Sequence, residues 1–444
     1  MGWISLRVLA VLTASAAPQA AQTPKVADEV VADARREHDS LVAAGYNVTQ
    51  GWKLVSHPEK TTTRHEVIVP EEDGEHSFTL WGEVRQGQLS LRLLGPDGAV
   101  RTAWSGRKGE ATTSFPAALG TYVVEIDQPA GSSGFAILGI KGPALHRCEI
   151  ENGLMEEHAA SPAKGFNWPY LLWRPKEARA PNLLVLPNNT GFTSEDLTLL
   201  RASASCEIQR QSTLATRLGA PILVPLFPRP VVGQDDLYLQ ALTRSSLETS
   251  TEKFRRVDQQ LIAMIDDAKA ALHSARVEIG PKVLLWGFSA SGSFVNRFAM
   301  LHPDRVRAVA SGSPGGWPLA PTDESGGDKL TYPVGVGDLH ELVGTGLDIV
   351  TLKQVSWLFF MGDQDKNDAV VFRDSFSKAQ EEIIFRHFGP TPVSRWTKAE
   401  GLYKALGLEA LFKLYPGAAH SVTPEMDEDI ALFFEKAIGH PSGR

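Results

Sequence analysis

Residues 283–292, Val-Leu-Leu-Trp-Gly-Phe-Ser-Ala-Ser-Gly, decide how the rest of this chain is interpreted. The first four are a short apolar run of the kind that forms a fully buried strand. The segment that follows, residues 293–300, spaces its apolar side chains as a helix does. A serine on a sharp turn between a strand and a helix is the setting in which a Gly-x-Ser-x-Gly pattern marks a nucleophile. We therefore predict that Ser289 is a catalytic nucleophile.

The pattern around Ser289 departs from its usual form at one position. Gly287 supplies the first small residue, but Ser291 stands where a second glycine is usual, and Gly292 follows it. Serine is small enough for the close backbone approach that such a turn requires. The alternative is an ordinary strand-to-helix turn that happens to be rich in glycine and serine.

A nucleophilic serine needs a base, and the base needs an acid that orients it. On a sheet of this kind the order along the chain is serine, acid, histidine. His420 lies in a loop of small residues after an apolar run and before the last predicted helix, at residues 427–438. The other histidines after Ser289 lie in helical segments, in the tail, or before the acid. We predict His420 as the base.

The acid is predicted within residues 362–368, Gly-Asp-Gln-Asp-Lys-Asn-Asp, directly after another apolar run. Asp365 is preferred, and Asp363 and Asp368 remain competitors. The same stretch partly imitates a calcium loop, with oxygen ligands at alternate positions, but aspartate stands where that loop needs glycine and a strand precedes it. We expect no metal site.

An acyl-transfer site also needs N–H donors for the developing oxyanion. Ala290 follows the nucleophile and would begin the helix, so its N–H is the first predicted donor. The second is expected from Asn189 or Thr190, in the loop after an earlier apolar run. Trp317, in a later loop, and Tyr238, in a possible lid at 226–253, are predicted substrate contacts. Trp317 could instead only pack.

Apolar runs alternate with helical segments from residue 165 to 440. This alternation predicts a doubly wound, mostly parallel sheet with helices on both faces. The runs begin near Tyr170, Asn182, Pro221, Lys282, Val306, Val355 and Leu411.

The first part of the chain has a different pattern. Residues 1–21 resemble a signal peptide, with Arg7 before a short apolar core, so we expect a secreted or periplasmic protein. A helix is predicted within residues 22–47. Short alternating runs and Gly/Pro turns at 48–144 predict a β-sandwich-like accessory domain. Residues 145–164 are predicted to be a polar linker.

Trp81 and Trp104 in the predicted accessory domain could be platforms for a carbohydrate or polymer, but buried packing is the favoured interpretation. The sequence leaves open whether its two cysteines, Cys148 and Cys206, form a disulfide. It gives no indication of the oligomeric state.

Composition excludes several classes of protein. The chain has 444 residues, 43% of them hydrophobic, and a formal net charge of −8. Length alone favours about two to three domains. Neither the charge nor any Lys/Arg-rich run suggests nucleic-acid binding, and the sequence has no apolar stretch long enough for a membrane span.

The stretches at 287–292, 362–365 and 417–420 together resemble the α/β-hydrolase superfamily, over about residues 166–438. Within it they resemble secreted esterases of the polyhydroxybutyrate depolymerase and feruloyl or acetylxylan esterase type. The resemblance implies an α/β-hydrolase fold and hydrolysis of small or polymeric carboxylic esters through an acyl-enzyme, without a cofactor. The sequence departs from it at Ser291 and in having Asn188-Asn189 in place of a His-Gly oxyanion motif.

Two alternatives remain open. A serine peptidase of the prolyl-oligopeptidase type also joins a β-rich part to this fold, but residues 48–142 are too short for its propeller. A non-enzymatic hydrolase-like binding protein would have no need of all three members of the triad.

Overall fold

The computed structural model describes residues 28–44, 46–48, 52–54, 61–69, 75–116, 120–130, 134–141, 148, 150, 152–178, 181–190, 195–230, 237–372 and 375–439. The predicted signal peptide at 1–21 lies outside these residues. Among the helices of the described part, none is both long enough and apolar enough to cross a membrane.

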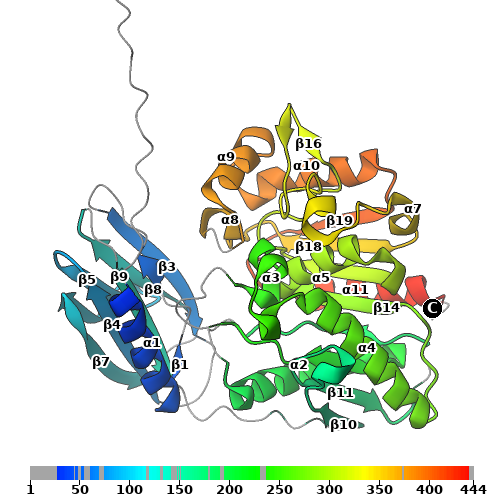
Figure 1. Ribbon diagram of the computed structural model, residues 1–444, viewed down its shortest axis with the longest axis horizontal. Coiled ribbons are helices and arrows are strands. Elements are labelled where there is room, and N and C mark those ends of the chain that lie inside the picture. Colours follow the sequence, from blue (N-terminus) through cyan, green and yellow to red (C-terminus); the bar gives the residue numbers. More distant parts are fainter. Residues whose placement is uncertain are drawn as a thin grey trace, which may run out of the picture.

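The second half of the chain is built on an eight-stranded sheet (Figure 1). Its strands lie in the order β10-β11-β13-β12-β14-β15-β18-β19. Strand β11 runs antiparallel to both of its neighbours, and the pairs from β13 to β19 are parallel. The strands are β10 (Gly153–His158), β11 (Tyr170–Pro175), β12 (Leu184–Val185), β13 (Ile222–Pro225), β14 (Val283–Phe288), β15 (Val306–Gly312), β18 (Ser356–Gly362) and β19 (Ala410–Tyr415).

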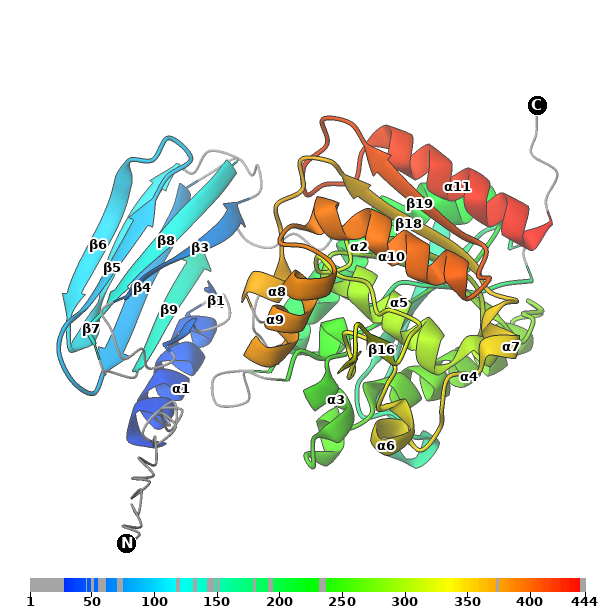
Figure 2. The ribbon, with the colours of Figure 1, turned by 90° about the horizontal axis from the view of Figure 1, so that it is seen from above.

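Strand β14 is apolar throughout because both faces of the sheet are covered. Val283 and Leu285 point into one apolar core, and Leu284 and Trp286 point into the other. The first core is closed by α4 (Val257–Ser274), α5 (Ala290–Leu301) and α10 (Pro392–Ala405), and the second by α2 (Leu197–Leu218) and α11 (Pro424–Ile438). Figure 2 shows β18 and β19 between α10 and α11. The predicted doubly wound sheet is confirmed.

Short elements connect this framework. They are η1 (Pro162–Lys164), η2 (Leu239–Ala241), α3 (Arg244–Glu248), η3 (Glu252–Phe254), η4 (Pro303–Arg305), β16 (Glu324–Ser325), β17 (Asp328–Lys329), α6 (Leu339–Val343), α7 (Ile349–Leu352), α8 (Ala369–Phe372) and α9 (Lys378–His387).

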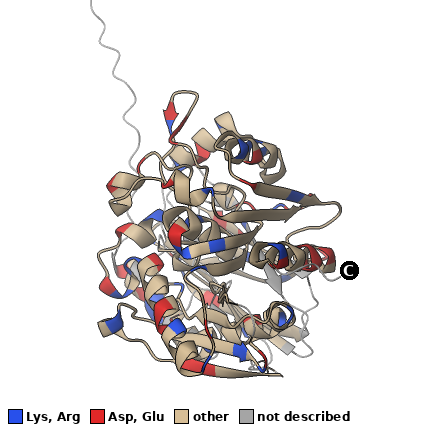
Figure 3. Ribbon diagram, turned by 90° about the vertical axis from the view of Figure 1, so that its right-hand side faces the viewer, with Lys and Arg blue, Asp and Glu red and all other residues tan. Residues whose placement is uncertain are grey.

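Helices α2 and α11 are also joined at the surface. The Arg217 guanidinium donates to the carboxylates of Glu428 and Glu435, at 2.6 and 2.8 Å for the shortest contact to each. Figure 3 shows Lys and Arg interspersed with Asp and Glu along the helices on that side of the molecule. Exposed pairs of this kind add little stability, so the buried apolar face of each helix holds it in place.

The first half contains α1 (Asp28–Ala43) and two antiparallel sheets, ordered β1-β9-β4-β7, with β2 also paired to β9, and β3-β8-β5-β6. Leu80 and Leu138 of one sheet pack against Leu91 and Val124 of the other, so the predicted sandwich is present. The strands are β1 (Asn47–Val48), β2 (Trp52–Leu54), β3 (Thr61–Val69), β4 (Glu75–Val84), β5 (Leu89–Leu94), β6 (Val100–Gly106), β7 (Lys108–Pro116), β8 (Gly120–Gln128) and β9 (Gly134–Lys141).

Trp81 and Trp104, the tryptophans considered as ligand platforms, are packing residues. Trp81 is 4% exposed and lies with Val30, Ala34 and Leu41 of α1 in a small apolar cluster. Trp104 is half-buried against the sandwich core, and its indole lies over Gly109, where an added Cβ would meet the ring nitrogen at 2.9 Å. These contacts favour packing over a role as ligand platforms.

The predicted linker at 145–164 is wrong from Gly153 onward. Gly153–His158 forms β10, the edge strand of the large sheet, paired antiparallel with β11. None of its residues is fully buried, so their composition resembles a connection rather than a buried strand. Just before it, Cys148 forms a disulfide with Cys206 of α2. The segment that enters the large sheet is therefore covalently tied to the first long helix beside that sheet.

Candidate active site

Ser289 occupies a strained turn between β14 and α5. Its φ is +61° and its ψ is −121°, a conformation that residues with a side chain rarely adopt. Two hydrogen bonds hold the turn: the Ser289 N–H donates to the carbonyl of Gly312 at 2.9 Å, and the Ser293 N–H donates to the carbonyl of Ser289 at 3.0 Å. The backbone therefore presents the Ser289 hydroxyl at the carboxyl edge of the sheet, as the sequence pattern predicts.

Close backbone contacts explain the small residues of this turn. A Cβ on Gly287 would lie 2.3 Å from the carbonyl oxygen of Ser291, and one on Gly292 would lie 2.3 Å from that of Gly312. Ser291 itself stabilises the turn, since its Oγ accepts from the Phe288 N–H at 3.0 Å and its O–H donates to the Phe288 carbonyl at 2.9 Å. Gly292 thus makes the close approach to β15, and a serine is accommodated at position 291.

The loops after β18 and β19 meet because these two strands are parallel neighbours. Gly362 and Tyr415 end the strands at the same level, and the Gln364 N–H donates to the carbonyl of Ala418 at 2.9 Å. This brings the Asp365 Oδ2 and His420 Nδ1 atoms to 2.8 Å. The preferred acid and the predicted base are therefore paired.

The environment of Asp365 favours its charged form. Burial of its side chain raises the pKa, but the hydrogen bond and charge of His420 and the hydrogen bond from the Asn367 N–H outweigh burial and lower it below the ordinary value. An ionised carboxylate only accepts hydrogen bonds, so Nδ1 carries the hydrogen and Nε2 presents a lone pair. That is the tautomer a general base requires.

The two competing carboxylates have other partners. Asp363 accepts from the Gly417 N–H at 2.8 Å, and Asp368 forms a buried two-point ion pair with Arg395 at 2.8 and 2.9 Å. The alternate oxygen ligands that imitate a calcium loop therefore have separate partners. In the described part of the chain, no group of three or more His, Cys, Asp or Glu side chains could hold a metal ion.

Asn367 lies between the predicted nucleophile and base, and it was missed as a site residue. Its Nδ2 is 2.9 Å from His420 Nε2 and 3.5 Å from Ser289 Oγ. Among the described residues, Ser289 makes no hydrogen bond directly with His420. The only available signal was its position two residues after the acid, which does not reveal where its side chain points.

The predicted oxyanion donors have different outcomes. Ala290 is the first residue of α5, where a backbone N–H has no acceptor within the helix. The side-chain amide of Asn189 donates to the Phe288 carbonyl at 3.4 Å. The prediction of Thr190 as an oxyanion donor is wrong, because its N–H donates to Gln240 Oε1 at 3.1 Å. Neighbouring Asn188 exchanges two hydrogen bonds with the backbone of Phe227, which fixes this loop beside the turn.

The two predicted substrate contacts also differ. Tyr238 is largely buried against Ala290, with the Arg229 guanidinium 3.8 Å from its ring centroid, so it forms a wall beside the nucleophile. The prediction of Trp317 as a substrate contact is wrong. Its side chain is 1% exposed, stacks on Phe388 and donates to the Val334 carbonyl at 2.8 Å. The packing alternative holds for Trp317.

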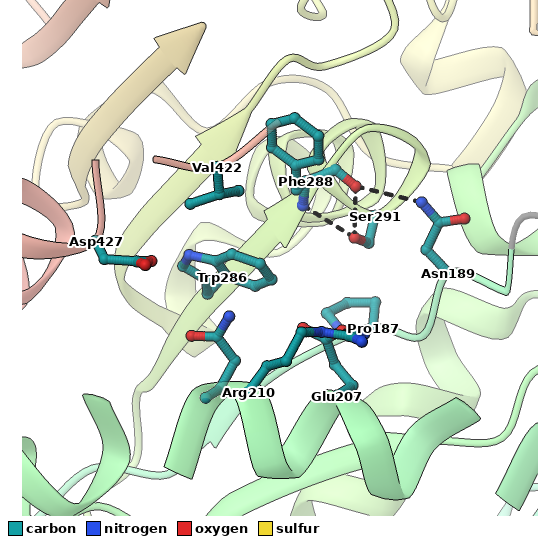
Figure 4. Close-up of a pocket in the computed structure, with 10 residues that line it drawn as sticks. Pro187, Asn189, Glu207, Arg210, Trp286, Phe288, Ser291, Val422 and Asp427 are labelled. Carbon is teal, nitrogen blue, oxygen red and sulfur yellow. Dashed lines mark hydrogen bonds and ion pairs between the residues drawn. The ribbon is translucent and has the colours of Figure 1, made fainter. Parts of the chain in front are cut away.

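A pocket of about 400 Å³ lies between the turn, α2 and the start of α11 (Figure 4). Phe288 lines this pocket and also contacts His420, with the two ring centroids 4.8 Å apart. The pocket is lined by Pro187, Asn189, Glu207, Arg210, Gln211, Trp286, Phe288, Ser291, Val422 and Asp427. It adjoins the site from behind the nucleophile turn.

Comparisons with known proteins find distant similarities to solved structures. No protein-family model matches the chain, and no curated protein does. Poly(aspartic acid) hydrolase-1 from Sphingomonas sp. KT-1 matches with 14% identity and a TM-score of 0.42, over 66% of this chain and 100% of that chain. The poly(3-hydroxybutyrate) depolymerase LpqC from Bordetella parapertussis matches with 21% identity and a TM-score of 0.41, over 64% and 89%.

A siderophore hydrolase, EstB from Aspergillus nidulans, matches with 14% identity and a TM-score of 0.36, over 67% of this chain and 98% of that chain. These TM-scores are all below 0.5, so the assignment of the fold rests on the structure itself. The parallel sheet, the positive-φ serine after β14, and the acid and histidine after β18 and β19 show that this part of the chain has the α/β-hydrolase fold.

Proposed function

We propose that this protein is a secreted serine hydrolase that cleaves carboxylic esters. The observation that carries the proposal is the 2.8 Å contact between Asp365 and His420, in loops that lie at the same edge of the sheet as the strained Ser289. An acid, a base and a nucleophile at one edge of the sheet form the constellation of covalent acyl transfer.

The proposed reaction has two halves. His420 takes the proton of Ser289 while Oγ attacks the ester carbonyl, and Ala290 with Asn189 donates hydrogen bonds to the oxyanion. His420 then returns the proton to the leaving alcohol, which leaves an acyl group on Ser289. Water, deprotonated by the same imidazole, releases the acid and restores the serine. Asp365 keeps the proton on Nδ1 and stabilises the imidazolium.

Export is part of the proposal. It rests on the signal-like pattern at residues 1–21 and is supported by the disulfide between Cys148 and Cys206, because disulfides persist mainly in oxidising compartments.

The test combines labelling by a fluorophosphonate probe with hydrolysis of nitrophenyl esters of short and long acyl chains. Ser289→Ala should abolish both, while Ser212→Ala should change neither, since the Ser212 hydroxyl bonds only within α2, to Gln209. Labelling of Ser289 without ester turnover would favour the peptidase. A wild-type protein that reacts with neither reagent would refute the proposal and favour a binding protein.

A further inference from the structure

The amide of Asn367 occupies the place that the Ser289 hydroxyl must take for catalysis. Its nitrogen contacts the Nε2 atom of His420 at 2.9 Å and lies 3.5 Å from Ser289 Oγ. A general base must be within hydrogen-bond reach of the proton that it removes. Here the group within reach of the base is the asparagine and not the serine.

Because of the direction of this hydrogen bond, Asn367 competes with Ser289 for the Nε2 atom of His420. The N–H at Nδ1 donates a hydrogen bond to Asp365, so Nε2 is an acceptor with a single lone pair in the plane of the ring. The Asn367 N–H therefore donates to the lone pair that would receive the proton of Ser289. In the opposite orientation of the amide, its oxygen would face that lone pair, and the two electron-rich groups would repel each other. One lone pair serves one donor, so the serine stays unactivated while the asparagine is bound.

The Asn367 backbone is held by a hydrogen bond, and its side chain reaches toward the partly exposed site. The Asn367 N–H donates to Asp365 Oδ1 at 2.9 Å, and the next residue, Asp368, is held by buried Arg395. The Asn367 side chain is itself only partly buried. A rotation about its side-chain bonds would free His420 without moving Asp365.

We propose that Asn367 is an inhibitory positioning residue: its amide occupies His420 in the resting protein and leaves when an ester fills the site. This inference rests on the proposed function, because it acts through the same histidine and serine. A substrate large enough to occupy the space in front of Ser289 displaces the amide. A small reagent does not, and so reacts with a serine that is activated only part of the time.

The inference predicts two changes in Asn367→Ala. The labelling rate at alkaline pH should rise roughly threefold to tenfold, the range expected from removing one competing neutral hydrogen bond. The midpoint of the pH profile should also move to higher pH, because a donor to Nε2 stabilises the neutral imidazole and its loss favours the protonated form. A structural defect would lower the rate and leave the midpoint unchanged.

The experiment measures the second-order rate of fluorophosphonate labelling against pH, with the labelled residue identified by mass spectrometry. Gln364→Ala is the matched control, since it removes an exposed amide from the same loop. Asn367→Asp keeps the shape but replaces the donor by an acceptor, so its midpoint should move further to higher pH than that of the alanine variant. Thermal unfolding of each variant checks that the fold is intact.

Each outcome decides one of the two proposals. Faster labelling of Ser289 with a raised midpoint in Asn367→Ala supports the inhibitory contact. Labelling that is equal or slower, in a protein whose wild type is labelled at Ser289, overturns the contact and leaves the esterase proposal standing. If neither wild type nor Asn367→Ala is labelled at Ser289, both proposals fail.

Discussion

Asp363, Asp365 and Asp368 are near neighbours in the chain, yet each has a different partner. Asp365 contacts the imidazole of His420, Asp363 accepts from a backbone N–H, and Asp368 neutralises buried Arg395. Identical side chains are thus distinguished only by the groups that face them. Replacing each by asparagine should separate the chemistry of the site from its stability.

Asp365→Asn should lower kcat for nitrophenyl ester hydrolysis by about 10³–10⁴-fold, since an amide can hold the wrong tautomer of the imidazole. Asp363→Asn should stay within a few-fold of wild type, because only the Gly417 N–H contact depends on it. Both rates are measured on protein whose melting temperature has been recorded. Equal losses in the two variants would show that the acid is wrongly assigned.

Asp368→Asn should act on stability instead. It leaves the Arg395 guanidinium, whose side chain is 1% exposed, without its carboxylate. Breaking such a buried pair typically costs about 3–5 kcal/mol. Denaturant unfolding should reveal this loss, whereas the rate per folded molecule should change much less than in Asp365→Asn. An unchanged unfolding midpoint would contradict this account of the ion pair.

Strand, turn and chain order predict where Ser289, Asp365 and His420 lie, and the structure brings Asp365 and His420 into contact. Asn367 and Trp317 could not be placed correctly, since sequence spacing does not fix a side-chain rotamer. Asn367 turns toward His420, and Trp317 turns into a cluster beneath Phe388. The prediction of Thr190 as an oxyanion donor is wrong for a similar reason, since its N–H donates to Gln240, which lies far away in the chain.

Among the secondary-structure elements, the nucleophile turn depends on the contact between α5 and β15. Gly292→Ala would place a Cβ 2.3 Å from the Gly312 carbonyl, and backbone cannot easily retreat from it. We expect lower thermal stability and slower fluorophosphonate labelling, because the turn that presents Ser289 must shift.

Gly401→Ala is the control for that substitution. Gly401 lies in α10 with nothing within 4 Å of an added Cβ, so alanine should stabilise the helix by about 0.5–1 kcal/mol. Both variants replace glycine by alanine, but Gly292→Ala is expected to lower the stability and Gly401→Ala to raise it. A Gly292→Ala protein as stable and as reactive as wild type would mean that α5 and β15 are less tightly packed than the structure indicates.

Buried elements were more predictable than exposed ones. Strand β14 is apolar because both faces are covered, so its composition alone identifies it. Strand β10 is a polar edge strand, and it was predicted as a linker for that reason.

For the molecule as a whole, acid stability should depend on the buried carboxylate of Asp258. Asp258 accepts from Arg256 at 2.8 Å and from His302 at 2.9 Å. Burial raises its pKa, but the two cationic partners outweigh burial and lower the pKa from 3.8 to about 2.

The sign of the effect follows from that shift. A carboxyl whose pKa is lower in the folded state stabilises the protein above its unfolded pKa, and this contribution is lost as the pH falls through the folded pKa. The contribution is about 2 kcal/mol, lost between about pH 4 and 2. Asp258→Asn should be less stable than wild type at pH 7, with a difference in melting temperature that narrows below pH 4. A constant difference would contradict the role of this carboxylate.

The disulfide between Cys148 and Cys206 ties the segment that precedes β10 to helix α2. It closes a loop with a sequence separation of 58, which restricts the unfolded chain. A cross-link of this kind contributes about 2–4 kcal/mol to stability.

The double variant Cys148→Ser, Cys206→Ser should therefore unfold at lower temperature, and a thiol reductant should lower the wild-type melting temperature but not that of the variant. Since neither cysteine contacts Ser289 or His420, the rate of ester hydrolysis per folded molecule should be unchanged. A reductant without effect on the wild type would show that the bond contributes nothing to folding, and it would remove the structural support for export.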